Sequence, residues 1–261
     1  MPRLPLLLLL LLHLLPPPAS PYCILRQDCA PGAPGCLPRA TLPSERAPFP
    51  LSPSGGDPLA CPQYGAAGCC TALANSQLFL SFLIAQASLG EPSSGGCPAC
   101  YANVAALWCA FACAPFQSDF LSLQGPVNVT NNATGRSELV LAATAALSAG
   151  FAGGVFGSCA GVGLVRGNPA MDTLPAFFSS MGVGQAEAAG AMRVDFEVGG
   201  GAPGALDIPA LNCCSYPANA TDPGGVGNAT CPCASCLGMC PGGNCTSAAA
   251  LGAEGALEEL P

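Results

Sequence analysis

The longest apolar stretch beyond the N-terminal leucines runs from Cys69 to Leu89 and contains the segment TALANSQLFLSFLIAQASL. When it is placed on a helix of 3.6 residues per turn, apolar residues fall on nearly every side, and Gly90 and Pro92 follow as stop signals. We therefore predict a helix that is buried all round its axis. Such a helix needs cover from other parts of the chain on every side.

A second helix is predicted in the segment that starts at Cys97. Residues recur there at helical spacing on one side: Tyr101, Val104, Ala105, Trp108 and Ala112. Cys109 and Cys113 lie one turn apart on a neighbouring side. The pattern predicts a helix that two disulfides link to its surroundings.

Capping signals predict a third helix from Ser137 to Gly150. Ser137 is a good N-cap residue, Glu138 follows in the first turn, and Gly150 is a stop signal. The glycines of 150–168 predict a loop or at best a frayed helix, and 170–181 predicts a short apolar helix interrupted near Pro175.

Strict alternation of apolar and charged residues identifies the clearest strand, at residues 192–198, and a Gly/Ala/Pro linker follows at 199–206. Residues 22–60 are rich in Pro and Ser and predict loops ordered by disulfides. The cysteines of 231–245 are too dense for an apolar core and predict a disulfide knot. We expect the Ala/Gly/Glu tail at 246–261 to be disordered.

The N-terminus predicts a signal peptide at residues 1–20. Arg3 provides the positive charge, an almost unbroken leucine core follows, and prolines and small residues end it. The core is too short for the roughly 20 residues that span a bilayer, although an uncleaved signal anchor is the alternative. We expect the chain to be luminal or secreted, or the front of something longer.

The missing residue types and the net charge exclude several classes of function. The 261 residues contain no Lys, and the single histidine, His13, lies in the predicted signal peptide, so Schiff-base, phosphate-loop and Ser-His-Asp chemistries lack a required residue. This absence removes most hydrolases and nucleotide enzymes and is consistent with our prediction of a non-enzymatic protein without a cofactor. A formal charge of −8 would repel a phosphate backbone, so we expect no nucleic-acid partner.

The 18 cysteines all follow the signal segment, and in an oxidising compartment they predict up to nine disulfides. Two alternatives involve Cys97 and Cys100. With Cys109 and Cys113 they resemble a tetrathiolate zinc site, and alone they resemble the redox pair of a thiol oxidoreductase. The sixteen other cysteines favour structural disulfides over both alternatives.

Glycosylation is predicted at five N-x-Ser/Thr sequons, which in a secreted chain indicate surface loops. Their asparagines are Asn128, Asn132, Asn219, Asn228 and Asn244.

Cysteine motifs carry a resemblance to a known family. A Cys-Pro at Cys61, the vicinal pair Cys69 and Cys70, the segment CPACYANVAALWCAFACAPFQSDFL from Cys97 and the closing CPCASCLGMC occur in that order. The chain thereby resembles the N-terminal luminal domain of the Niemann-Pick type C cholesterol transporters over residues 22–245. Folate and riboflavin carriers share a looser form of the cysteine framework, so a secreted vitamin-binding module is the alternative.

The resemblance implies an α+β fold in which several helices pack on a small mixed sheet. It also implies a cysteine-rich sterol-binding domain at 21–245 with a deep apolar pocket that takes the sterol hydroxyl first. The resemblance implies seven definite disulfides: Cys23–Cys69, Cys29–Cys36, Cys61–Cys109, Cys70–Cys113, Cys97–Cys231, Cys100–Cys159 and Cys233–Cys240. It pairs Cys236 with either Cys213 or Cys214. Cys245 would then pair with whichever of Cys213 and Cys214 remains.

The resemblance also implies ligand-binding positions. Asp28, Leu78, Tyr101 and Trp108 match lining or neighbouring residues of the family's pocket, and Leu174 would belong to a helix at the pocket mouth. This chain departs from the family at two polar positions, which are Gly35 and Ala74 here. Asn75 or Gln77 would then supply the hydrogen-bond donor for the hydroxyl.

The resemblance implies binding of cholesterol or an oxysterol and a part in intracellular cholesterol transport. The sterol would come from a small soluble carrier in the acidic lumen of late endosomes or lysosomes and pass toward a membrane. Full-length relatives continue into transmembrane helices, so we expect this chain to be a truncated product or a partial gene model. The sterol preference, the partner of Cys245 and the oligomeric state do not follow from the sequence.

Overall fold

The computed structural model describes residues 21–26, 39–51, 59–90, 96–130, 135–160, 162, 173–186, 192–199 and 204–211. Its helices are α2 (Ala72–Ala85), α3 (Pro98–Cys113), the short α4 (Gln117–Phe120), α5 (Ala149–Cys159) and α6 (Leu174–Ala186). Short turns of helix are η1 (Pro43–Glu45), η3 (Pro62–Tyr64) and the π-helical η4 (Gln86–Gly90). The strands are β1 (Leu25–Arg26), β2 (Arg39–Ala40), β3 (Leu121–Thr130), β4 (Ser137–Leu147) and β5 (Arg193–Val198).

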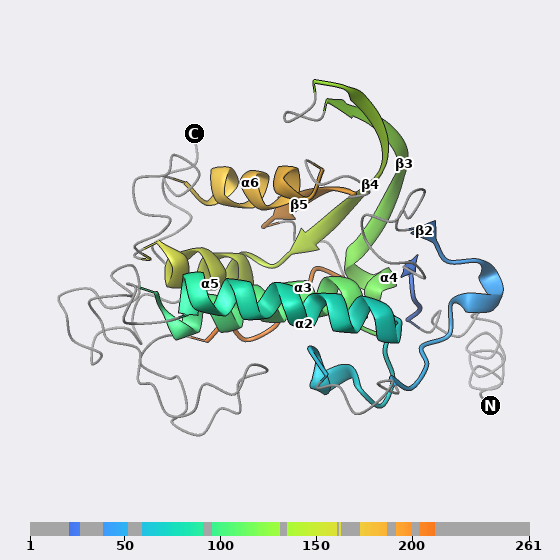
Figure 1. Cartoon of the computed structure of the whole chain (residues 1–261), viewed down its shortest axis with the longest axis horizontal. Helices are drawn as coiled ribbons and strands as arrows, with labels where there is room; N and C mark the ends of the chain where they lie inside the picture. Colours follow the sequence, from blue (N-terminus) through green and yellow to red (C-terminus); the bar gives the residue numbers. More distant parts are fainter. Residues whose placement is uncertain are drawn as a thin grey trace, which may run out of the picture.

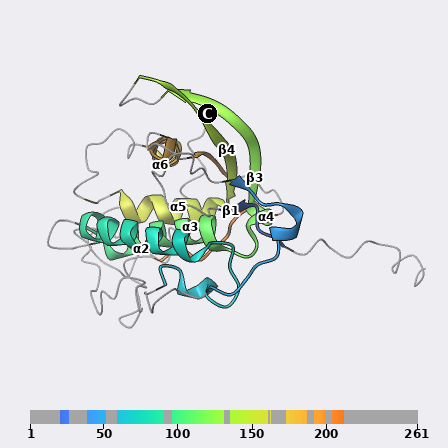
Figure 2. The same cartoon turned by 45° about the vertical axis from the view of Figure 1, so that its right-hand side comes forward.

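The predicted α+β class with a small mixed sheet is confirmed. Strand β4 pairs antiparallel with β3 and parallel with β5, which gives the order β3-β4-β5. Beyond the short β5, β3 and β4 continue as a curved hairpin that leaves the helices (Figures 1 and 2). A separate two-stranded ladder joins β1 to β2.

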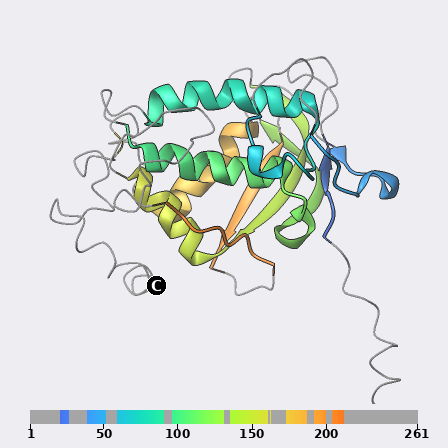
Figure 3. The ribbon, with the colours of Figure 1, turned by 90° about the horizontal axis from the view of Figure 1, so that it is seen from below.

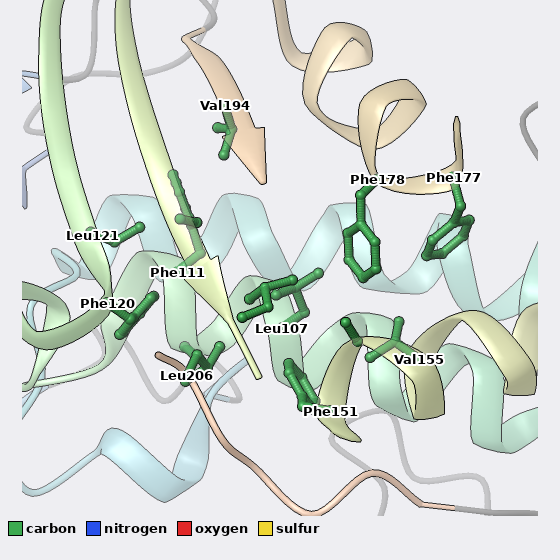
Figure 4. Packing of buried hydrophobic residues seen from close by; sticks show 14 of the residues in the cluster. Leu107, Phe111, Phe120, Leu121, Phe151, Val155, Phe177, Phe178, Val194 and Leu206 are labelled. Carbon is green, nitrogen blue, oxygen red and sulfur yellow. The ribbon is translucent and has the colours of Figure 1, made fainter. Parts of the chain in front are cut away.

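Helices α2, α3 and α5 lie side by side in one layer, with α2 outermost (Figure 3). Helix α6 packs on β5 and contacts α5. The main core lies between α3, α5, α6 and the sheet, where Phe177 and Phe178 project from α6 toward Val155 of α5 (Figure 4). A second apolar cluster lies between α2 and α3. Helix α3 therefore contributes one side to each cluster.

The predicted helix from Ser137 to Gly150 is wrong, because this segment is strand β4. The alanine-rich sequence favours a helix by propensity, but β4 is the central strand and residues 142–145 are all buried. Tertiary packing therefore outweighs the local preference. Strand β3, which carries Gly125 and Pro126, was not anticipated from the sequence pattern.

Residues 150–168 were predicted as a loop or at best a frayed helix, and the first half is helical, as the regular helix α5; most of the remainder lies outside the described residues. Ser148 is the N-cap, and its side chain accepts a hydrogen bond from the Phe151 N–H at 3.1 Å. Helix α6 begins at Leu174, so Pro175 lies in its first turn, where a proline is tolerated, and does not interrupt it. The strand predicted at 192–198 is confirmed as β5.

Four disulfides join the described elements: Cys23–Cys69, Cys61–Cys109, Cys70–Cys113 and Cys100–Cys159. All four are pairs that the family resemblance implies. Cys97 is disulfide-bonded as well, and its expected partner Cys231 lies outside the described residues. So do the other expected disulfides, which involve Cys29, Cys36, Cys213, Cys214, Cys233, Cys236, Cys240 and Cys245. The signal segment 1–20 and the tail 246–261 also lie outside.

Gln117 belongs to the segment CPACYANVAALWCAFACAPFQSDFL that carries the family resemblance, and it lies just after α3. Its completely buried amide oxygen accepts hydrogen bonds from the Ile24 and Leu25 N–H groups at 2.9 and 3.1 Å. Its nitrogen donates to the carbonyls of Phe111 and Ala112 at 2.8 and 3.0 Å. One side chain thus joins β1 to the end of α3.

Candidate functional site

Helix α2 places three of the expected ligand residues on its inner side. Its N-cap, Thr71, accepts a hydrogen bond from the Ala74 N–H at 3.2 Å, which fixes where the helix begins. Ala74 and Asn75 are buried, and Leu78, one turn after Ala74, is half-buried. The expectation of a helix covered on every side is wrong, however, because the opposite side of α2 is exposed.

Helix α3 contributes Tyr101 and Trp108, which lie two turns apart on one side. Tyr101 is 1% exposed, and its hydroxyl is inaccessible to solvent. The end of η4 lies against its ring, since a β-carbon on Gly90 would be 3.1 Å from the Tyr101 Cβ. Trp108 is half-buried.

These residues meet in the cluster between α2 and α3. Ala74 and Tyr101 belong to its buried part, and Leu78 and Trp108 pack against it. The structure thus brings together four positions that are up to 34 residues apart in the sequence. Neither helix contains an Asp, Glu, Lys, Arg or His, so α2 and α3 bring no formal charge to this cluster.

Trp108 connects this cluster to the main core. Its ring makes edge contacts with Phe111 and Phe196, at centroid distances of 5.5 and 6.3 Å. Phe196 of β5 contacts Phe178 of α6 at 5.2 Å. Leu174, expected at the pocket mouth, begins α6 and packs against the same core as Trp108. An aromatic series therefore runs from the α2–α3 site to α6.

Asn75 and Gln77, the two candidate donors, lie in different places. Asn75 is 1% exposed, and its Oδ1 accepts a hydrogen bond from the Ala60 N–H at 2.9 Å. Gln77 is half-buried and shares the outer side of α2 with Leu73, Leu80 and Ile84. Asn75 is the one that points its polar group into the interior.

Other expected positions are only partly covered by the structure. Asp28 and Gly35 lie outside the described residues, as do Asn132, Asn219, Asn228 and Asn244. Asn128 is exposed on β3, and its side chain stands on the face opposite to the half-buried Val127 and Val129.

A groove of about 330 Å³ lies elsewhere, between the β1–β2 ladder and β3. None of the expected ligand residues lines it; the lining residues are Tyr22, Ile24, Ala40, Thr41, Arg46, Ser118, Leu121, Ser122 and Leu123. The sequence analysis missed this groove because it is formed by segments about a hundred residues apart, and no motif marks it.

The oxidoreductase and zinc alternatives disagree with the pairing of the cysteines. Cys100 is bonded to Cys159, and Cys109 and Cys113 are bonded to Cys61 and Cys70. Because these thiols are consumed, Cys97 and Cys100 form neither a redox pair nor part of a tetrathiolate. Within the described residues, no group of three His, Cys, Asp or Glu side chains is placed to bind a metal ion.

These features define a disulfide-rich α+β domain with an apolar cluster between two uncharged helices. Residues 20–250 match the family model described as Niemann-Pick C1 N terminus, and the chain belongs to this family. It is 37% identical over 83 residues to a Caenorhabditis elegans protein named NPC intracellular cholesterol transporter 1 homolog 1. That match covers 30% of this chain and 6% of the relative's length.

Proposed function

We propose that this chain binds cholesterol or a related sterol at the site between α2 and α3 and takes part in sterol transport. The observation that carries the proposal is the gathering of Ala74, Leu78, Tyr101 and Trp108 in one uncharged apolar cluster. Membership in the Niemann-Pick C1 N-terminal family supports a sterol-binding role. The C. elegans relative is itself named a cholesterol transporter.

The energetics of such a site are favourable. A rigid tetracyclic sterol that buries roughly 400 Å² of hydrocarbon gains on the order of 10 kcal/mol at about 25 cal/mol per Å². Several kcal/mol are lost to restricted freedom on association. Two disulfides link α3 to the segments before α2, Cys61–Cys109 and Cys70–Cys113, and would limit collapse of the site when it is empty.

The sterol hydroxyl needs a polar partner inside the apolar site. We assign this role to Asn75, because it is buried beside Ala74 while Gln77 lies on the outer side of the helix. The hydrogen bond from Ala60 fixes the Oδ1, so the Nδ2 is the group that would donate to the hydroxyl.

The setting we propose is the lumen of late endosomes or lysosomes. The disulfides are consistent with an oxidising secretory route. A small soluble carrier would deliver the sterol, and a membrane would receive it. A charge of −8 and two helices without charged side chains favour a neutral ligand over an anionic lipid.

Radiolabelled cholesterol binding to the secreted protein tests the proposal. We expect saturable binding that Trp108→Ala abolishes, because Trp108 joins the two apolar clusters at the site. Phe116→Ala is the matched control, since Phe116 is a half-buried ring that packs instead against Tyr64 and Phe120. Equal binding by the Trp108 and Phe116 variants would remove Trp108 from the site. Saturable binding of folate or riboflavin instead of sterol would favour the vitamin-carrier alternative.

The role of Asn75 is tested by comparing Asn75→Leu with Gln77→Leu. We expect the Asn75 variant to bind cholesterol about tenfold more weakly, the effect of losing about 1.4 kcal/mol of hydrogen bonding, and the Gln77 variant to bind normally. Thermal unfolding of both variants separates a loss of binding from a loss of fold. The reverse order of affinities would assign the hydroxyl to Gln77.

A further inference from the structure

The outer side of α2 carries a concentrated exposed apolar surface. Leu73, Leu80, Leu83 and Ile84 are 39, 61, 43 and 73% exposed. They are four of the six exposed large hydrophobic residues in the described part of the chain. Leu73, Leu80 and Ile84 follow one stripe of the helix, and Leu83 lies beside it. We refer to these four side chains as the α2 surface.

The helix that carries this surface has no charged residue from Ala72 to Gly90. This 19-residue segment is long and apolar enough to cross a membrane by length and composition alone, yet few of its residues are buried. An apolar patch of this size is comparable to the largest patch on a typical monomeric protein, and such patches are often functional. Figure 3 shows α2 at the edge of its helix layer.

We propose that the α2 surface docks the protein on the face of a lipid bilayer with uncharged headgroups. The helix would lie in the interface and would not span the bilayer. Its other side is held in the protein by the buried Ala74, Asn75 and Phe82. The disulfides Cys23–Cys69 and Cys70–Cys113 also attach the chain to the protein directly before the helix.

The α2 surface is too small to favour a second copy of the chain as its partner. The four side chains expose roughly 400 Å², about half of the ~800 Å² that each partner buries in an interface of standard size. Partial insertion into a bilayer needs no such area, because each aliphatic side chain leaves water independently.

The charge of the protein indicates which lipid headgroups the α2 surface would bind. Binding to anionic leaflets uses Lys and Arg on the polar side of an interfacial helix, and α2 and α3 have none. The formal charge of −8 would also oppose an anionic surface. A zwitterionic phosphatidylcholine leaflet therefore matches the α2 surface best. The docking does not rest on sterol binding, although the same helix forms one side of the proposed site.

Flotation of the full secreted chain with sterol-free phosphatidylcholine vesicles tests the docking. We expect the wild-type protein to float with the vesicles and the double variant Leu80→Gln/Ile84→Gln to partition at least about tenfold less, because two aliphatic side chains no longer enter the interface. The matched control is Leu139→Gln, which changes a leucine that is 58% exposed on β4 and should leave partitioning unchanged.

Each other outcome overturns the proposal. A wild-type protein that stays with the solvent has no docking surface of this kind. Stronger binding to phosphatidylserine vesicles, or loss of binding in high salt, would indicate an electrostatic contact. A wild-type dimer that the double variant converts to a monomer would make a second copy the occupant. Because no sterol is present, these results are independent of the Trp108 experiment.

A measurement on the unmodified protein tests the docking even if the variants lose binding because they misfold. Photoactivatable phosphatidylcholine should label peptides from residues 72–90, which mass spectrometry identifies. Labelling confined to other peptides would contradict the docking even if the variants lose binding.

Discussion

At the scale of single residues, the described ion pairs involve neither α2 nor α3. Arg39 and Glu45 form a two-pronged ion pair with N–O distances of 2.6 and 2.8 Å. Glu45 also accepts a hydrogen bond from the Leu42 N–H. The hydrogen bonds from Arg39 and Leu42 lower the pKa of Glu45 from 4.5 to about 2.

This lowered pKa predicts how the ion pair responds to acid. Because the pKa falls on folding, the pair stabilises the folded state above about pH 4.5 and loses this effect as the pH drops toward 2. It should therefore stay intact at the pH of about 5 to 6 at which endosomal switches operate. Titration of the Glu45 carboxyl by NMR should give a midpoint near 2, which Arg39→Gln raises.

The control for this titration is Arg193→Gln, which breaks the separate Arg193–Asp195 pair and should leave the midpoint of Glu45 unchanged. An unshifted midpoint in the Arg39 variant would show that Arg39 does not hold the carboxylate.

At the scale of elements, η4 packs closely against α3 beside the proposed site. Gly90 ends η4 and is buried against Tyr101. An added methyl group would meet the Cβ and Cγ of Tyr101 at 3.1 and 3.3 Å, which is closer than packed carbon atoms normally approach.

We expect Gly90→Ala to lower the free energy of unfolding by about 1 to 3 kcal/mol, because the tyrosine ring or η4 must shift. Urea denaturation measures this change. Gly150→Ala is the matched control, since a methyl group at Gly150 in α5 meets no atom within 4 Å and alanine favours a helix. A neutral Gly90 variant would mean that η4 moves freely relative to α3.

The sequence predicted the elements whose patterns are local. The helical spacing around Trp108 and the alternation at 192–198 were sufficient for α3 and β5. The strand at 137–147 was mistaken for a helix because its burial depends on β3 and β5, which no local pattern reveals. Likewise, Gln117 belongs to a recognisable motif, but its bonds to Ile24 and Leu25 join segments more than ninety residues apart.

For the candidate site, too, the sequence predicted only what depends on a local pattern or on the family resemblance. Tyr101 and Trp108 could be placed by the family resemblance and by helical spacing on one element. The different positions of Asn75 and Gln77 depend on the rotation of α2 against α3, which an almost uniformly apolar helix does not encode. For the same reason the exposed side of α2 was not foreseen.

At the scale of the whole molecule, α3 is shared by two apolar clusters and is cross-linked on both sides. Cys100–Cys159 joins it to α5, and Cys61–Cys109 and Cys70–Cys113 join it to the segments before α2. Trp108 lies where the two clusters meet. We therefore propose that a neutral, flat apolar ligand binds beside this residue.

Trp108 is the single tryptophan of the chain, so its fluorescence reports on the proposed site directly. Titration of the secreted protein with cholestatrienol, a fluorescent cholesterol analogue, should quench the Trp108 emission saturably by energy transfer, and unlabelled cholesterol should reverse the quenching. Sterol that binds without quenching Trp108, or no saturable binding at all, would contradict the account.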